Sequence, residues 1–306
     1  MQPLLSKYGR VVKNLASELL NCAPGDRLLP VQEYAARLEV SVGTVQSALD
    51  HLQAVGSATF DPRGRLGTFA RSLHYPLLWS LAKSRSVIGT MPLPYSRRLS
   101  GLATGIRLQF GRQPVELSLR FMRGAVNRLQ ALATGQFDWA LVSSFAAQTA
   151  HAHGFDITVL FSLGPATYMA DHVLLMRGTS SGIQDGMRVG VDLQSNDHTY
   201  LIRAFSRGKS VEFVEIEYER GAVLIRSGEI DATVWSREDL PADLSDLSVI
   251  ALDYQTEPAL MALSEGAIVI NRGNLPVANV LRAVLNQDEL VQIQRDVIDL
   301  NRLPSY

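Results

Sequence analysis

Two short helical patterns separated by a tight break constrain this chain more than any other feature. Ser41 stands at the break and makes a favourable helix start, because its hydroxyl can accept from the free N–H groups of a first turn. Apolar residues recur at helical spacing on both sides, at Tyr34, Ala35 and Leu38 before the break and at Val45, Ala48, Leu49 and Leu52 after it. The pattern predicts a helix-turn-helix.

A β-hairpin is expected directly after the second of these helices. Gly56 ends that helix, and residues 58–60 alternate as a strand. Residues 61–67 carry Pro62, Gly64 and Gly67 and are typical of a tight turn, after which residues 68–70 form the returning strand. A helix-turn-helix followed by a hairpin is a winged helix.

The stretch resembles the DNA-binding domain of GntR-type regulators. The matching segments are PGDRL at 24–28, Val40-Ser41, Thr44-Val45, Ala48-Leu49 and Gly67-Thr68-Phe69. The chain departs from that pattern at Val42 and Gln46, where the family usually has arginine, and at residues 30–32, where it usually has Ser-Glu-Arg. The resemblance implies DNA binding, and a small helical bundle without a DNA role is the alternative.

The residues expected to contact DNA are Ser41, Thr44, Gln46, Ser47, Arg63, Arg65 and Thr68. Gln46 can pair bidentately with adenine, while Thr44 and Ser47 can reach base edges or phosphates. Arg63 and Arg65 flank a glycine at the hairpin tip, a position suited to phosphate or to the minor groove. Arginines that are merely solvated at the tip are the alternative.

Net charge and chain length indicate how this N-terminal winged helix, called the head below, would bind DNA. Residues 1–72 hold eight Lys/Arg and six Asp/Glu, a net charge of +2, which is weakly basic for phosphate binding. One copy would bind DNA feebly, so we expect a homodimer on a double-stranded operator. A chain of 306 residues suits about two domains.

The expected location is the cytoplasm. The N-terminal stretch is interrupted by Lys7, Arg10 and Lys13 and lacks the apolar region and cleavage site of a secretory signal. No run reaches the ~18 apolar residues of a membrane span, and the single Cys22 permits no internal disulfide.

The expected domains are a winged helix at 1–72, a connector at 73–86 and a two-lobed body at 87–306. The connector contains Leu77, Leu78, Trp79 and Leu81 after Pro76, which predicts a short helix too apolar to be a free linker. It should pack against the body or a second subunit.

The body repeats one pattern in two halves. Strand patterns at 86–90, 115–121 and 139–142, and again at 188–192, 211–216 and 232–235, are separated by helical patterns, which predicts parallel pairing. Each half contains a helix, then Gly-x-x-Asp, then an apolar strand, in GQFDWALV and in GEIDATVW. This is similar to two-lobed periplasmic-binding-protein-like domains, so the fold class expected is an α+β winged helix followed by an α/β, type II domain of that kind. Lobe I would take about 87–172 and 255–306, and lobe II about 173–254.

Further motifs narrow the resemblance. The segments MPLPYSRRLSGLATGI, MRGAVNRLQALATGQFDWALVSS and LGPATYMADHVLL, together with the final PSY, resemble YhfZ-type regulators over nearly the whole chain. The group combines a GntR-like winged helix with a two-lobed C-terminal domain, and the resemblance implies a transcriptional regulator.

A ligand is expected at the carboxyl ends of the parallel strands, where α/β folds bind small molecules. That criterion selects Met91, Pro94, Tyr95, Ser96, Met122, Arg123, Gly124, Ser143, Ser144, Ser195, Asn196, Tyr218 and Trp235. Free N–H groups at helix starts and the Arg123 guanidinium favour an anionic or zwitterionic effector. Plain helix caps and turns are the alternative for each residue alone.

No catalytic residue, metal site or cofactor is expected. The only cysteine lies in the head, and His151 and His153 have no matching acidic cluster. The alternatives are a cytoplasmic enzyme, using Ser143 or His198, or a ligand-binding protein on the same two-lobed fold with a DNA-tethering head.

Overall fold

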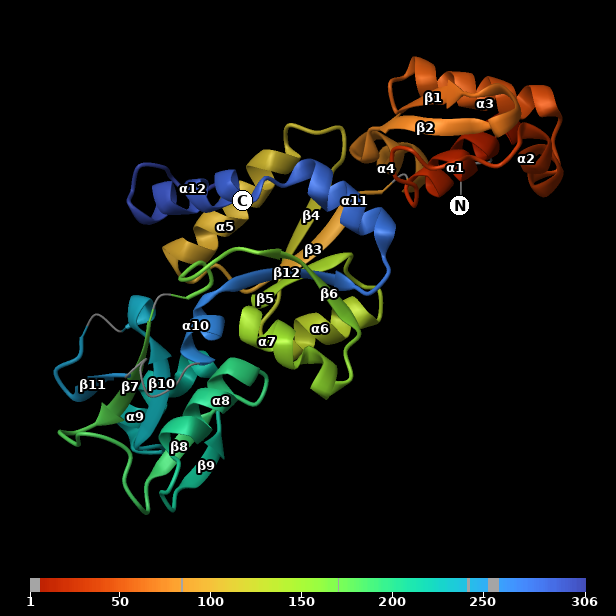
Figure 1. Ribbon diagram of the computed structural model, residues 1–306. Helices are drawn as coiled ribbons and strands as arrows, with labels where there is room; N and C mark the ends of the chain where they lie inside the picture. Colours follow the sequence, from red (N-terminus) through yellow and green to blue (C-terminus); the bar gives the residue numbers. More distant parts are fainter. Residues whose placement is uncertain (1–5, 84, 170, 241–242, 253–258) are drawn as a thin grey trace. The chain divides into compact units, whose positions relative to one another are not determined.

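The computed structural model describes residues 6–83, 85–169, 171–240, 243–252 and 259–306 (Figure 1). It divides into two compact units. Unit 1 comprises Met1–Val87, Arg107–Ser118 and Gly273–Asn286, and unit 2 comprises Ile88–Ile106, Leu119–Arg272 and Gln287–Tyr306.

Unit 1 contains the predicted helix-turn-helix and hairpin. Its helices are α1 (Lys7–Leu19), α2 (Val31–Leu38), α3 (Val42–Ala54), α4 (Tyr75–Lys83) and α11 (Leu275–Val284). Strand β1 (Ala58–Pro62) pairs antiparallel with β2 (Thr68–Leu73) around the short 3-10 turn η1 (Gly64–Leu66). The hairpin strands are longer than the sequence predicts. An apolar stripe at helical spacing from Leu4 to Leu20 also predicts the supporting first helix, and the start of that prediction, at Leu4, lies outside the described residues.

Local chemistry explains the tight break between α2 and α3. Glu39 ends α2 in the left-handed region, at φ 55°, and the Ser41 hydroxyl accepts from the Thr44 amide at 3.2 Å, as predicted for an N-cap. Gly56, at φ 74°, follows the end of α3. Leu15, Tyr34 and Leu52 are buried between the three helices.

Helix α4 explains the apolar connector. Leu78 and Trp79 are fully buried, and α4 packs against α1 and α11. Asn279 of α11 adds a hydrogen bond from its side-chain amide to the Leu20 carbonyl, at 3.0 Å. The expected short helix is therefore present and is covered within unit 1.

Unit 2 is built on two five-stranded sheets, which define lobe I and lobe II. The lobe I sheet has the order β4-β3-β5-β12-β6, with strands Leu117–Phe121, Val87–Met91, Trp139–Ser143, Gly266–Asn271 and Ile157–Ser162. The lobe II sheet has the order β11-β7-β10-β8-β9, with strands Leu247–Ala251, His172–Arg177, Ala232–Ser236, Arg188–Val191 and Glu212–Glu215. Because β7 to β11 belong to one sheet and β12 to the other, the chain passes between the lobes twice.

Both sheets are mixed. Strand β3 pairs parallel with β5, and β8 pairs parallel with both β9 and β10, as the alternating pattern predicts. Strands β12 and β7 run antiparallel to their neighbours, a feature that the pattern does not predict.

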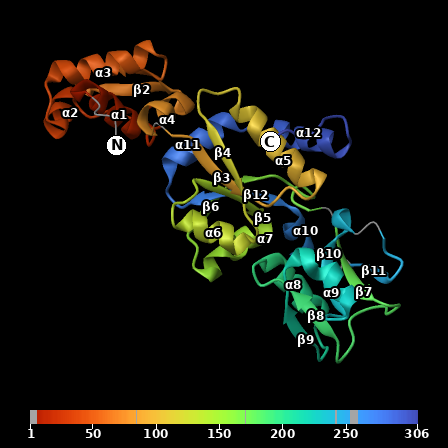
Figure 2. The same cartoon turned by 180° about the vertical axis from the view of Figure 1, so that it is seen from behind.

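The helices cover these sheets as Figures 1 and 2 show. They are α5 (Arg97–Phe110), α6 (Ala125–Ala133), α7 (Ser144–Thr149), α8 (Asn196–Phe205), α9 (Gly221–Ser227), α10 (Ala259–Ser264) and α12 (Gln287–Ile298). Helices α6 and α7 pack on β5 and β12, whereas α8 packs on β8 and β10. Helices α5 and α12 lie side by side, and the Gln294 side chain of α12 donates a hydrogen bond to the Arg98 carbonyl of α5.

The repeated Gly-x-x-Asp pattern has the same structure in both lobes. Gly135 and Gly228 end their helices at φ 73° and 77°, in the left-handed region that glycine tolerates. Asp138 accepts from the Ile88 amide at 2.8 Å, and Asp231 accepts from the Arg188 amide at 2.9 Å. Each carboxylate thus fixes the start of the strand beside it.

The described helices include none with both the length and the hydrophobicity needed to cross a membrane.

Candidate functional site

Four of the residues expected to contact DNA, Ser41, Thr44, Gln46 and Ser47, lie at the start of α3. Several of their polar groups already have hydrogen-bond partners. The Ser41 hydroxyl contacts the Thr44 hydroxyl at 2.9 Å as well as its amide. The Gln46 amide donates to Asp50 at 3.0 Å, so pairing with adenine requires that this bond be exchanged. The Ser47 side chain is exposed, and its carbonyl accepts from Tyr8 at 3.5 Å.

The two wing arginines differ in their surroundings. Arg63 pairs with Asp61 at 2.8 Å, and its guanidinium lies 4.5 Å from the centre of the Phe69 ring. Arg65 is exposed, and within the described part of the chain no side chain or carbonyl forms an ion pair or hydrogen bond with it. Thr68 is half-buried at the start of β2, where its carbonyl accepts from Leu28.

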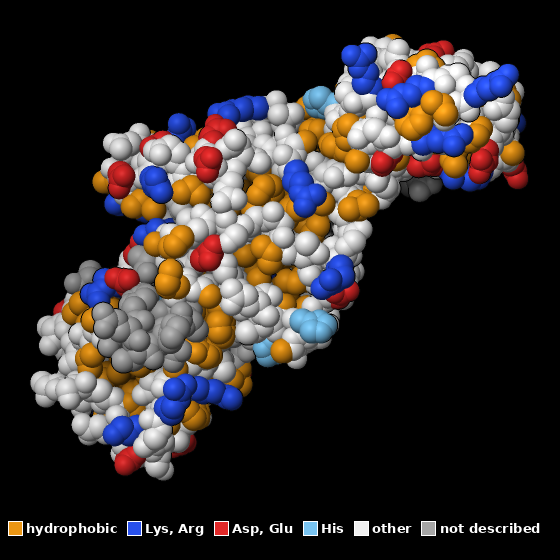
Figure 3. Space-filling model, in the orientation of Figure 1, with side chains coloured by type: hydrophobic (Ala, Val, Ile, Leu, Met, Phe, Trp, Pro, Cys, Tyr) orange, Lys and Arg blue, Asp and Glu red, His pale blue; other side chains and the backbone are white. Residues whose placement is uncertain are grey.

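Two further cations lie beside these residues. Lys7 lines a shallow groove with Ser41 and Thr44, at the start of α3. Arg27 lies against the wing turn, since a Cβ built on Gly67 would stand 2.8 Å from its Nε atom. Figure 3 shows Lys and Arg side chains spread over the visible face of this domain with acidic residues between them, which agrees with its small net charge.

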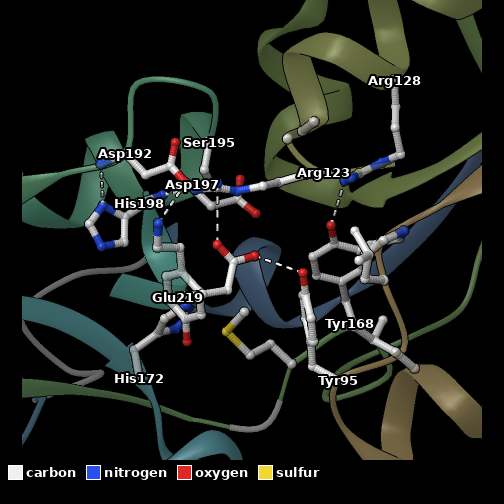
Figure 4. Close-up of a pocket in the computed structure, with 17 residues that line it drawn as sticks. Tyr95, Arg123, Arg128, Tyr168, His172, Asp192, Ser195, Asp197, His198 and Glu219 are labelled. Carbon is white, nitrogen blue, oxygen red and sulfur yellow. Dashed lines mark hydrogen bonds and ion pairs between the residues drawn. The ribbon is translucent and has the colours of Figure 1, made fainter. Parts of the chain in front are cut away.

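Unit 2 contains a pocket of about 130 Å³ lined by residues of both lobes (Figure 4). A cavity of about 150 Å³ accepts a molecule the size of benzene, so this one suits a similarly small ligand. Five predicted residues line it: Tyr95, Arg123, Gly124, Ser195 and Tyr218.

Eight predicted residues do not line this pocket: Met91, Pro94, Ser96, Met122, Ser143, Ser144, Asn196 and Trp235. Met91 is fully buried in β3, and Trp235 stacks on Tyr218 at 4.5 Å. The Ser96 and Ser143 hydroxyls accept from backbone amides at helix starts, and the Met122 carbonyl accepts from Arg128.

Arg123 is surrounded by carboxylates. It donates to Asp192 at 2.8 Å and lies 3.3 Å from Glu219 and 3.7 Å from Glu217, all in lobe II. Burial acts to lower the pKa of Arg123, but the hydrogen bond and the three negative charges raise it overall. Glu219 also accepts from the Tyr95 hydroxyl at 2.7 Å, and Figure 4 shows its carboxylate between Tyr95 and Arg123. Arg123 is therefore already neutralised.

A second arginine lines the pocket without a carboxylate partner. Arg128 is 2% exposed and donates to the carbonyls of Leu141 and Met122, at 3.0 and 2.7 Å. Its third partner is the Tyr168 hydroxyl, at 2.8 Å. Within the described residues it forms no ion pair.

Lobe II contributes a buried carboxylate and a buried histidine. Asp197 accepts from the Ser143 hydroxyl at 2.8 Å, and burial raises its pKa to about 6. His198 accepts from the Asp192 amide at Nδ1 (3.1 Å), so Nε2 carries the proton and donates to the Val234 carbonyl (3.0 Å). Burial lowers the pKa of His198 to about 4 and that of His172, which also lines the pocket, to about 3.

Sequence reasoning did not select twelve of the lining residues as ligand contacts, although it named His198 for the alternative function, an enzyme: Pro92, Leu93, Leu99, Ala125, Arg128, Tyr168, Met169, His172, Asp192, Asp197, His198 and Glu219. The sequence could have indicated Asp192, because it ends a predicted strand of lobe II and ligands are expected at strand ends. It could not have indicated Arg128, since an arginine within a helical pattern normally faces solvent. In the described part of the chain, His, Cys, Asp and Glu side chains form no group of three that could hold a metal.

Comparisons with known proteins agree with this architecture. Residues 74–306 match the family described as YhfZ C-terminal domain, and residues 23–70 match the family described as Helix-turn-helix domain. The uncharacterized protein YhfZ of Escherichia coli K12 is 31% identical over 303 residues, covering 99% of this chain and 98% of that protein.

Solved structures show the same fold. The crystal structure of YhfZ from Shigella flexneri is similar with a TM-score of 0.64 and 30% identity, over 76% of this chain and 98% of that one. The periplasmic aliphatic sulphonate binding protein SsuA of Escherichia coli matches in fold, with a TM-score of 0.53 and 17% identity over 71% of this chain and 75% of that one. The predicted class, a helix-turn-helix domain followed by a periplasmic-binding-protein-like α/β domain, is confirmed.

Proposed function

Because this chain belongs to the YhfZ family, we propose that it is a cytoplasmic, DNA-binding transcriptional regulator whose two-lobed domain binds a small effector. The observation that supports this best is the combination, in one chain, of a helix-turn-helix with a pocket that contains buried charged side chains. A pocket of this kind is typical of ligand sites.

In this proposal residues 1–72 form the GntR-like DNA-binding domain, 73–86 the connector and 87–306 the effector domain. The predicted boundary between lobe II and the last part of lobe I, at 254/255, lies outside the described residues. Thr44, Gln46 and Ser47 of α3 face the bases, while Arg65 of the wing, Arg27 beside the wing turn and Lys7 beside the start of α3 hold the phosphates.

Binding of an effector would account for the buried charged side chains of unit 2. Buried polar groups near Ser143 and His198 also fit an enzyme, the alternative function. However, both ring nitrogens of His198 are bonded to backbone groups, and the Ser143 hydroxyl donates to Asp197. The histidine is therefore not placed to take a proton from the serine, which favours the regulator.

The DNA-binding half of the proposal is tested by selection of duplexes from a random library with the full-length protein, followed by titration of the enriched sequence. A specific regulator prefers its site over random duplex by about a thousandfold or more. Equal affinity for enriched and random duplexes would contradict it.

We also propose that the regulator acts as a homodimer, because a head of net charge +2 whose α3 lacks arginine offers one copy little affinity. Sedimentation of the full chain, alone and with a palindromic duplex, measures this directly. A monomer at micromolar concentration in both samples would be inconsistent with the dimer.

A further inference from the structure

The wall of the pocket contains two buried side chains of opposite charge that are not paired with each other. Arg128 of α6 and Asp197 of α8 both line it, and they are 2% and 7% exposed. Each acts on the other electrostatically, since the Arg128 charge lowers the pKa of Asp197 against the larger effect of burial. Yet the structure holds no ion pair between these two side chains.

Buried charges without an ionic partner are costly, because neutral hydrogen bonds replace only part of the lost hydration. The three hydrogen-bond partners of Arg128 are two carbonyls and a phenol, and the Asp197 carboxylate accepts from the Ser143 hydroxyl. Arg128 has five N–H groups, so it retains donors beyond these bonds. A ligand that carries both charges would satisfy both residues.

Tyr168 adds a directed donor beside Arg128. Its oxygen accepts from Arg128, so its own hydroxyl proton is left to donate, and it has no acceptor among the described residues. Tyr168 is 8% exposed and lines the pocket. Figure 4 shows Tyr168 and Arg128 on one side of the pocket and Asp197 on the lobe II side.

The rest of the wall is apolar and limits the size of the ligand. Pro92, Leu93, Leu99 and Met169 line the same space, which encloses about 130 Å³. Arg123, in contrast, is held by Asp192, Glu217 and Glu219 and offers no free charge.

We propose that the effector is a small zwitterion, whose carboxylate binds Arg128 and Tyr168, whose ammonium group binds Asp197, and whose short apolar chain lies against Leu93, Leu99 and Met169. This rests on the proposed function, and it replaces Arg123 with Arg128 as the anion anchor. An ion bound between two buried, pre-positioned charges is recognised by both lobes at once.

The test uses calorimetric titration of the full-length protein with matched probes at pH 7.5. The zwitterions are α-, β- and γ-aminobutanoate, isomers in which the position of the ammonium group sets both the distance between the two charges and the length of the apolar side chain. Butanoate lacks the ammonium group, and butylamine lacks the carboxylate. At least one zwitterion should bind about tenfold or more tighter than both controls, since each charged hydrogen bond contributes at least that factor.

Two nearly isosteric variants separate the anchors without removing the backbone contacts of Arg128. Asp197→Asn should weaken the zwitterion about tenfold while leaving butanoate unchanged. Tyr168→Phe should weaken the zwitterion and butanoate by the same factor and leave butylamine unchanged. Arg203→Gln, a change at an exposed position of α8, serves as the control and should alter none of the three.

Three outcomes overturn the inference: no zwitterion binds, butanoate or butylamine binds as tightly as the best zwitterion, or both variants bind like the wild type. Duplex binding, measured on the same preparations, separates this failure from that of the proposed function. A protein that binds its selected duplex but none of the zwitterions is a regulator with a different effector.

Discussion

Arg63 and Arg65 stand two residues apart at the wing, and their neighbours give them different properties. Asp61 neutralises Arg63, and the Phe69 ring fixes its guanidinium in place. Arg65 keeps its full charge in solvent, so a phosphate gains more from Arg65 than from Arg63.

We therefore predict that Arg65→Ala weakens DNA binding more than Arg63→Ala does. Loss of one phosphate contact should lower the slope of log K against log salt by about one and reduce affinity alike for all sequences. Anisotropy titrations of a selected and a random duplex at several salt concentrations measure both effects. Equal losses for the two variants would show that the Asp61 pairing does not matter in the complex.

Protonation of the buried groups gives a second prediction at this scale. The pKa of His198 falls to about 4 and that of His172 to about 3, so below pH 6.5 the unfolded chain binds two protons that the folded one refuses. Asp197 acts in the opposite sense, because its pKa of about 6 in the fold exceeds 3.8. Between pH 6 and 4 the net effect is one proton, which destabilises lobe II by about 1.4 kcal/mol per pH unit on acidification.

Hydrogen exchange of the amides in β8 and β10 measures this locally, without requiring that the whole chain unfold in one step. Asp197→Asn removes the opposing contribution, so the dependence on pH should become steeper by a further ~1.4 kcal/mol per unit. Identical slopes for wild type and variant would mean that Asp197 is ionised throughout this range.

At the scale of elements, the turn between β4 and α6 brings a backbone of lobe I close to lobe II. Gly124 has φ 76°, and a Cβ there would stand 2.7 Å from the Gln194 carbonyl oxygen. Gly135, at the other end of α6, has φ 73° but open space around it. Both glycines have a positive φ, and Gly124 alone is in close contact with another backbone.

Gly124→Ala and Gly135→Ala should both destabilise unit 2 by about 1–2 kcal/mol, the cost of a positive φ for a residue with a Cβ. Only Gly124→Ala should also weaken binding in the pocket, since it separates Arg123 and Gly124 from Gln194. Chemical denaturation and ligand titration of both variants test this pair. Equal ligand affinities would remove the contact with Gln194 from the argument.

The elements that sequence reasoning predicted well are those with a local cause. The Ser41 cap, Gly56 and the two Gly-x-x-Asp turns each depend on residues within a few positions, and each is confirmed. Strands β6, β7 and β11 were not predicted, because each pairs antiparallel with a strand more than fifty residues away in the sequence. Arg128 escaped notice for the same reason, since only the Leu141 carbonyl and Tyr168 make it a buried residue.

At the scale of the whole molecule, a regulator must couple two events in two separate units. A ligand shifts the affinity for DNA only if it binds the two functional states differently, and the coupling is reciprocal. The connector helix α4 packs on α1 of the DNA-binding domain and on α11, which follows the last strand of the lobe I sheet. We therefore predict that α4 carries the coupling between effector binding and DNA binding.

The last prediction follows from this reciprocity. Whatever factor the effector imposes on duplex affinity, typically between about 5 and 150, the duplex should impose on effector affinity. Calorimetric titrations of effector into free protein and into protein saturated with the selected duplex measure the factor that the duplex imposes on effector affinity. Duplex titrations with and without effector measure the factor that the effector imposes on duplex affinity. Leu78→Ala, which leaves a cavity where the buried side chain of α4 packs, should bring both factors toward one while leaving each separate affinity within about threefold. Leu78 does not line the pocket and is not among the residues proposed to contact DNA. If the coupling survives Leu78→Ala unchanged in a protein that remains folded, α4 is a passive linker, and the signal passes through another element.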